Sequence, residues 1–159
     1  MRSEFRIRPL TEADLPAVLA IEQRCFPEDP WPESVFRSAL ADELCFWLAA
    51  EKDGKVVGYA GMQAVLDEGY VDNVAVDPEH RRQGAALSLM KGLLAESRRK
   101  ELRFLSLEVR AGNAPAIALY SSLGFETVGK RPGYYLRPPE DALIMTKTFA
   151  GEIIEDKKT

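Results

Sequence analysis

The chain has 159 residues, of which 46% are hydrophobic and 29% are charged, and its formal net charge is −4. This length and composition fit one globular domain with a full core, and no run approaches the roughly 20 apolar residues of a membrane span. The negative charge argues against a general nucleic-acid-binding protein and permits a basic protein or peptide as partner.

The cysteine and histidine content limits the chemistry further. Two cysteines, Cys25 and Cys45, have no close-spaced partner, and His80 is the one histidine. A disulfide framework, a metal site or a Ser/His/Asp triad is therefore not expected. The first residues, MRSEFRIRPL, lack the apolar core of a secretion signal. We expect a cytoplasmic protein that binds no metal, no nucleic acid and no membrane.

Hydrophobic periodicity predicts alternating strands and helices along the chain. In chain order, the expected elements are strand 5–8, a helix from Thr11 to Phe26, helix 33–40, strands 46–51, 56–66 and 70–76, helix 82–100, strand 102–109, helix 114–123, and strands 125–129 and 143–149. The proline-rich stretch CFPEDPWPESVF indicates a loop between the first two helices. Asp53-Gly54 indicates a hairpin turn, because this pair suits positive φ.

This order of elements predicts a mixed sheet with helices on both faces, in the α/β or α+β range. We expect residues 1–150 to form a single domain and residues 151–159, GEIIEDKKT, to form a frayed charged tail.

The stretch VAVDPEHRRQGAALSLM is the most specific feature. A strand ending at Val76 is followed by a short loop with Arg81, Arg82 and Gly84, and then by a long helix. The N–H groups and dipole of a helix N-terminus attract an anion, and Gly84 lets the backbone approach a phosphate closely. A plain strand–loop–helix connection uses the same residue types, so the residues alone leave both interpretations open. The stretch is neither a Walker loop nor a Rossmann fingerprint.

Three linked motifs resemble the GNAT superfamily of N-acetyltransferases over nearly the whole chain. They are Arg81-x-x-Gly84-x-Ala86 after an N-x-A-V-D-P strand end, the strand that carries Glu108, and N-x-x-A-x-x-L-Y-x-x-x-G-F, which ends at Phe125. Ala86 departs from the pattern, because the second small residue is often glycine. The resemblance implies a GNAT-like fold, with a central, mostly antiparallel mixed sheet of six to seven strands and about four helices on both faces.

The resemblance also implies acetyl-CoA as cosubstrate. The backbones of Val74, Ala75 and Val76 would hold the pantetheine arm and the acyl group. The pyrophosphate would be wrapped by the loop and helix start, namely Arg82, Gln83, Gly84, Ala85, Ala86 and Leu87. Asn113 and Tyr120 would contact the cosubstrate as well.

Finer features resemble the RimI-type branch, whose members acetylate the N-terminal alanine of a small-subunit ribosomal protein. These features are LEVRAGNAPAIALYSSLGF, the later Gly-Tyr-Tyr and EDALIM stretches, and an early Phe-Pro…Pro-Trp…Phe stretch. Trp31, Tyr134 and Tyr135 would then form a wall and lid for a peptide N-terminus. Without the resemblance, the pattern favours a core role for Trp31 and an ordinary strand role for the two tyrosines.

Glu108 lies in an otherwise apolar strand. Alternation places it on one face with Phe104, Ser106 and Arg110, away from the aliphatic residues. A carboxylate on a solvated face, or one paired with Arg110, explains this pattern without any function. The resemblance implies that Glu108 is the general base that accepts the proton of the acceptor amine.

Tyr120 shares a helix face with Ala116, Ile117 and Leu123, a spacing that favours a core aromatic. A phenol can also donate to a departing thiolate, and the resemblance implies this general-acid role for Tyr120. Both cysteines fall outside the matched motifs and are expected to be structural.

The predicted function is transfer of the acetyl group of acetyl-CoA to a protein N-terminal α-amine, by direct attack in a ternary complex. The expected acceptor is the N-terminal alanine of a small-subunit ribosomal protein, and the enzyme is expected to be a monomer or a weak homodimer. The alternatives are a GNAT enzyme that acetylates a small-molecule amine or a lysine side chain, and a non-catalytic acyl-CoA-binding regulatory module. The presence of both Glu108 and Tyr120 argues against the non-catalytic alternative.

Overall fold

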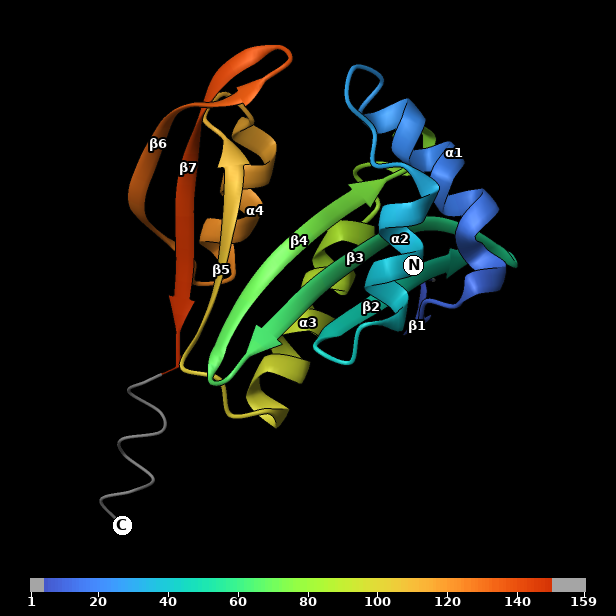
Figure 1. Cartoon of the computed structure of the whole chain (residues 1–159), viewed down its shortest axis with the longest axis horizontal. Coiled ribbons are helices and arrows are strands. Elements are labelled where there is room, and N and C mark those ends of the chain that lie inside the picture. Colours follow the sequence, from blue (N-terminus) through green and yellow to red (C-terminus); the bar gives the residue numbers. More distant parts are fainter. Residues whose placement is uncertain (1–4, 150–159) are drawn as a thin grey trace. The chain divides into compact units, whose positions relative to one another are not determined.

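The structure is a computed structural model that describes residues 5–149 (Figure 1). In chain order, its elements are β1 (Arg6–Pro9), the 3₁₀ turn η1 (Glu12–Asp14), α1 (Leu15–Cys25), α2 (Glu33–Ala41), β2 (Cys45–Lys52), β3 (Lys55–Val65), β4 (Glu68–Val76), the 3₁₀ turn η2 (Pro78–His80), α3 (Ala85–Arg99), β5 (Phe104–Arg110), α4 (Ala114–Ser122), β6 (Glu126–Leu136) and β7 (Pro139–Thr148).

The seven strands within residues 5–149 form one sheet in the order β1-β2-β3-β4-β5-β7-β6. Strand β2 pairs antiparallel with β1 and β3, and β7 pairs antiparallel with β5 and β6. Strand β4 pairs parallel with β5, where Glu68–Tyr70 lie opposite Phe104–Ser106. The predicted mixed, mostly antiparallel sheet with four α-helices in the described chain is confirmed.

The chain divides into two compact units. The first lies within Met1–Gln63 and Asp72–Glu96, and the second lies within Ala64–Val71 and Ser97–Thr159. Strand β4 therefore begins in the second unit and ends in the first. The expectation of a single domain over residues 1–150 stays a prediction, and the expected charged tail at 151–159 lies outside the described residues.

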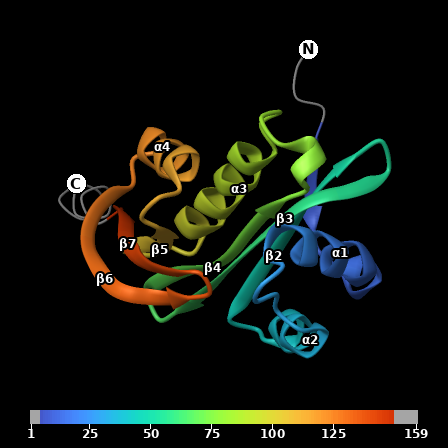
Figure 2. The ribbon, with the colours of Figure 1, turned by 90° about the horizontal axis from the view of Figure 1, so that it is seen from above.

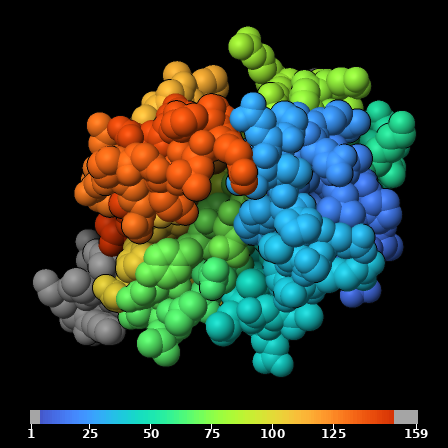
Figure 3. All heavy atoms as spheres, turned by 45° about the horizontal axis from the view of Figure 1, so that its top comes forward, coloured from blue at the N-terminus to red at the C-terminus, as the bar shows by residue number. Residues whose placement is uncertain are grey.

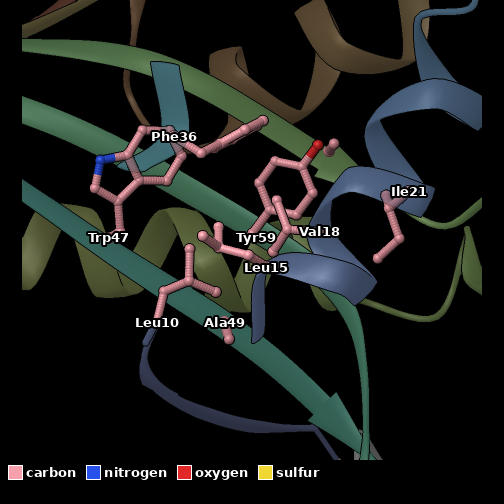
Figure 4. Close-up of a cluster of buried hydrophobic side chains, with 9 residues drawn as sticks. Leu10, Leu15, Val18, Ile21, Phe36, Trp47, Ala49 and Tyr59 are labelled. Carbon is pink, nitrogen blue, oxygen red and sulfur yellow. The ribbon is translucent and has the colours of Figure 1, made fainter. Parts of the chain in front are cut away.

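The core of the first unit lies between the sheet and helices α1 and α2. Apolar residues of both helices pack with residues of β2 and β3, and the cluster is shown in Figure 4: Leu10, Leu15, Val18, Ile21, Phe36, Trp47, Ala49, Tyr59 and Ala75. Side chains alternate across a strand, so Leu48 points to the other face and reaches the position of Gly92 in α3. Helix α3 thus covers the opposite face of this part of the sheet (Figure 2).

The second unit is built around β5. Its burial alternates as predicted, with Leu105, Leu107 and Val109 buried and the residues between them half-buried. Strand β7 lies beside it, with Leu107 opposite Met145 and Glu108 opposite Ile144. Helix α4 runs along one face of these strands (Figure 1).

Several predicted boundaries were wrong. Helix α1 begins at Leu15 rather than Thr11, because residues 12–14 form the 3₁₀ turn η1. Helix α3 begins at Ala85 rather than Arg82, because Arg82 and Gly84 have φ values of 64° and 94°, which a right-handed helix excludes. In the first turn of α3, Ala85 is buried and Ala86 is half-buried. Strands β6 and β7 extend to Leu136 and back to Pro139 through a bulge that the glycines and prolines of this stretch concealed. The Asp53-Gly54 turn is confirmed, since both residues have positive φ.

No helix in the described part of the chain is both long and apolar enough to cross a membrane.

The contact between Gly61 and Trp47 provides a test of the first unit's packing. A Cβ at Gly61 would lie 2.2 Å from Cδ2 of Trp47, whose ring is held by Phe36 at a centroid distance of 5.8 Å. We expect Gly61→Ala to lower the free energy of unfolding by about 3 kcal/mol, measured by chemical denaturation.

Gly129→Ala is the matched control, because a Cβ there would meet Cδ1 of Ile144 at an ordinary 3.4 Å. It should stay within about 1 kcal/mol of the wild type. Equal stability of the two variants would contradict the packing described for Trp47.

Candidate functional site

The loop between β4 and α3 is shaped for an anion. Asp77 accepts a hydrogen bond from the backbone N–H of Glu79, which closes the short turn η2. Gly84 adopts a φ of 94°, and no heavy atom lies within 4 Å of the place that a Cβ would take there. The first N–H groups of any α-helix have no partner within the helix, so the start of α3 suits an anion. The residues present therefore fit a bound pyrophosphate.

The end of β4 is held by the last turn of α1. The Arg24 guanidinium pairs with the Asp77 carboxylate at 2.7 Å, and the Cys25 thiol donates to the carbonyl of Val76 at 3.3 Å. Arg81 donates to the same carbonyl through Nε at 3.2 Å. These contacts therefore fix the last turn of α1 against the end of β4.

The predicted cosubstrate residues of the first unit lie where this strand and loop meet. Val74 is half-buried, whereas Ala75 and Val76 are buried. Around the loop, Arg82 and Gln83 are exposed, and Gln83 accepts a hydrogen bond from Lys52 at 2.9 Å. Ala85, Ala86 and Leu87 form the first turn of α3.

Glu108 is held by strand β6 rather than by its neighbour on β5. Its carboxylate accepts from Nε of Arg131 at 2.7 Å and from the hydroxyl of Tyr134 at 3.2 Å, and 30% of its side chain is exposed. The ion pair between Glu108 and Arg110 that the sequence allowed was wrong, because Arg110 pairs with Glu140 at 3.2 Å. The carboxylate is thus accessible and stands beside one of the predicted substrate-binding tyrosines.

The tip of the β6–β7 hairpin is fixed by a second set of contacts. The Arg110 guanidinium donates to the carbonyls of Arg137 and Pro138, and it lies over the ring of Tyr135 at 4.2 Å from the centroid. Tyr134 and Tyr135 meet edge to face with centroids 5.0 Å apart. Burial raises the pKa of both phenols, that of Tyr135 to about 12. Two outward-facing side chains of β5 therefore set the position of the paired tyrosines.

Tyr120 is buried in the second unit, with 8% of its surface exposed, and packs against Phe125 with ring centroids 5.9 Å apart. Burial raises the pKa of its hydroxyl to about 12, so the phenol stays protonated at neutral pH. Asn113 caps the same helix, since its side chain accepts from the N–H of Ala116 at 3.2 Å.

Trp31 packs against the core of the first unit, with ring centroids 5.3 Å from Phe36 and 6.0 Å from Trp47. Its backbone N–H donates to the carboxylate of Glu22 at 2.9 Å. The segment between α1 and α2 and the β6–β7 hairpin both lie at the surface, as Figure 3 shows in blue to cyan and in orange to red.

Sequence reasoning missed two residues that hold predicted ones. Arg131 binds Glu108, and the buried carboxylate of Glu22 accepts from the backbone N–H of Trp31 and also from Tyr59 and Asn73. A signal for Glu22 was present, because a charge follows Leu15 and Val18 at helical spacing on the apolar face of α1. None was present for Arg131, which is 23 residues from Glu108.

Comparison with known proteins identifies the family. The sequence model described as the acetyltransferase (GNAT) family matches residues 15–125. The chain belongs to the acetyltransferase (GNAT) family. Like the relatives described next, it is an N-acetyltransferase.

Two relatives and one solved structure extend the similarity over most of the chain. The ribosomal protein bS18-alanine N-acetyltransferase of Escherichia coli is 44% identical over 142 residues, which cover 87% of this chain and 94% of the relative. The N-alpha-acetyltransferase RimI of Mycobacterium tuberculosis is 35% identical over 89% of this chain and 90% of its own. The crystal structure of the Escherichia coli ribosomal-protein-S18-alanine N-acetyltransferase has a TM-score of 0.83 at 41% identity, covering 91% of this chain and 93% of that one.

The two thiols provide a pH-dependent test of the packing around the first unit's cysteines. Burial raises the pKa of Cys25 and raises that of Cys45 to about 11. The thiolate is the reactive form, so a pKa about 2.5 units above the usual 8.5 lowers the thiolate fraction of Cys45 at pH 8 roughly two hundredfold. We expect iodoacetamide to alkylate Cys45 at a rate that keeps rising beyond pH 10, measured by peptide mass spectrometry.

The urea-unfolded chain is the control, in which both thiols should react alike with a midpoint near the usual 8.5. A native-state rate for Cys45 that levels off below pH 9 would contradict the raised pKa. Neither thiol is then an activated nucleophile, in keeping with transfer that needs no acyl-enzyme.

Proposed function

We propose that this enzyme transfers the acetyl group of acetyl-CoA to the N-terminal α-amine of a protein, the acceptor being the N-terminal alanine of ribosomal protein bS18. The observation that carries the proposal is the 44% identity with the Escherichia coli bS18-alanine N-acetyltransferase over 87% of this chain. The accessible carboxylate of Glu108 beside Tyr134 supports the same acceptor chemistry.

The first unit supplies the groups that would bind acetyl-CoA. The open backbone at Gly84 and the N–H groups of Ala85, Ala86 and Leu87 receive the pyrophosphate, and the exposed Arg82 and Gln83 flank it. The backbone of Val74–Val76 holds the pantetheine arm and polarises the thioester carbonyl. Asn113 and Tyr120 stay predicted contacts of the cosubstrate.

Glu108 would accept the proton that the amine must lose before it attacks. At pH 7.5, deprotonation costs about 0.4 kcal/mol for an α-amine with a pKa near 7.8, but about 4 kcal/mol for lysine with a pKa near 10.4. A single carboxylate is therefore adequate for an N-terminus. The Arg131 guanidinium pairs with Oε2 of Glu108 at 2.7 Å. The incoming substrate ammonium would replace the guanidinium at this oxygen, so one cation is exchanged for another.

The bond changes then balance without a covalent enzyme intermediate. Glu108 takes the proton of the ammonium and releases it to solvent, and the neutral amine nitrogen then bonds to the thioester carbon. The carbon–sulfur bond breaks, and the second amine proton passes through solvent to the departing thiolate. Tyr120 donates a hydrogen bond to the departing sulfur. Because burial raises the pKa of Tyr120 to about 12, complete proton transfer to a thiolate of pKa near 8.5 would cost about 5 kcal/mol. Tyr120 therefore contributes mainly through the hydrogen bond.

Acetyl transfer to synthetic peptides, read by mass spectrometry, tests both the acceptor and the base. We expect the wild type to label a peptide beginning with alanine on its α-amine and to leave an N-terminally blocked, lysine-containing peptide unlabelled. Glu108→Gln should lower kcat/KM for the alanine peptide by roughly 10²- to 10⁴-fold, with acetyl-CoA binding unchanged.

Glu126→Gln is the matched control, because it makes the same change at an exposed position of β6. Arg131→Met removes the ion pair and keeps the carboxylate, so it should lose less activity than Glu108→Gln. Labelling of lysines or small amines alone would overturn the acceptor assignment. Undiminished turnover in Glu108→Gln would overturn the base.

A further inference from the structure

Glu22 is a buried carboxylate that the proposed chemistry does not use. It lies in α1 with 1% of its surface exposed. Oε1 accepts from the hydroxyl of Tyr59 and from Nδ2 of Asn73 at 3.0 Å, and Oε2 accepts from the backbone N–H of Trp31 at 2.9 Å. These donors belong to β3, β4 and the segment between α1 and α2. No ion pair involves Glu22 within residues 5–149.

Burying a carboxylate is costly, and a leucine would fill this position on the apolar face of α1 without that cost. The carboxylate instead fixes the relative positions of three segments, because a donor from each of them must reach one of its two oxygen atoms. Such a fully hydrogen-bonded buried network fixes one arrangement of the segments that contribute to it.

The donor from Trp31 is special in the sequence. Pro30 and Pro32 flank it, and proline has no N–H, so Trp31 carries the one backbone donor of these three residues. Glu22 takes that donor. The carboxylate therefore governs the course of the Pro30-Trp31-Pro32 backbone directly.

The other hydrogen-bond donors connect Glu22 to the end of β4, the strand that is proposed to hold the cosubstrate. Asn73 immediately precedes Val74–Val76, the stretch proposed to hold the acyl group. The neighbouring Cys25–Val76 contact and the Arg24–Asp77 ion pair join the same end of α1 to the same end of β4. All these residues lie in the first unit.

We propose that Glu22 is a positioning residue for the acceptor, which holds the Trp31 segment in a fixed relation to the acyl-holding end of β4. The inference rests on the proposed function for the identity of the acceptor. Glu22 acts through Trp31 and Asn73 and touches neither substrate. Its loss therefore weakens use of the peptide and leaves acetyl-CoA binding at the α3 start unchanged.

Glu22→Gln tests this with almost no change in volume. Glutamine keeps one acceptor oxygen, which satisfies Tyr59 and Asn73, but its NH₂ group then faces the N–H of Trp31, and two donors cannot pair. We expect the KM for an alanine-starting peptide to rise roughly ten- to hundredfold, with the KM for acetyl-CoA within about twofold of the wild type.

Tyr59→Phe is the matched control, because it removes a donor from the same carboxylate and leaves the Trp31 bond intact. Its peptide KM should stay close to the wild-type value. If the two variants lose thermal stability alike and both keep the wild-type peptide KM, Glu22 is only structural and the proposal fails. A rise in the KM for acetyl-CoA equal to that for the peptide would also overturn it.

Amide hydrogen exchange gives a second measurement that needs no activity. We expect the Trp31 amide to exchange slowly, and Glu22→Gln to accelerate it while the amides of β3 stay protected. A Trp31 amide that exchanges freely in the wild type would overturn the proposal. Failure to acetylate any peptide would instead contradict the proposed function. The exchange measurement would still test the hydrogen bond between Glu22 and Trp31, because it does not depend on activity.

Discussion

The ion pair between Glu108 and Arg131 is the contact on which the second unit's chemistry depends. It joins β5 to β6 at a nitrogen–oxygen distance of 2.7 Å, and the hydroxyl of Tyr134 donates to the other carboxylate oxygen. The same contact therefore holds the proposed base in place and sets the position of the tyrosine beside it. An exposed ion pair contributes little to stability, so its exchange for a substrate ammonium is energetically accessible.

In the first unit, a buried carboxylate holds the predicted substrate-binding residue Trp31 in place. Glu22 makes no ion pair among the described residues and accepts hydrogen bonds from three donors. The Glu108 side chain is exposed enough to change its ion-pair partner. The Glu22 side chain is buried and keeps the same three hydrogen-bond donors. Burial thus separates a carboxylate suited to proton transfer from one suited to holding the chain, although both are the same side chain.

Much of the fold follows from local patterns in the sequence. Alternation predicted the two faces of β5, and Asp53-Gly54 predicted its turn, because both depend on neighbouring residues. The start of α3 was predicted three residues early, since positive φ at Arg82 is set by the loop and carries no signal in the residue type. The Arg131 partner of Glu108 was unpredictable for a related reason. It depends on the β6–β7 register, which shifts between Arg131 and Tyr135.

The most direct test is a crystal structure of the protein with a bisubstrate analogue that joins CoA to the α-amine of an alanine-starting peptide. The account predicts that the α-nitrogen lies within hydrogen-bond distance of the Glu108 carboxylate, directly or through one water, and that the Arg131 guanidinium has left Oε2. An α-nitrogen bound at another group, with the Glu108–Arg131 pair intact, would contradict it.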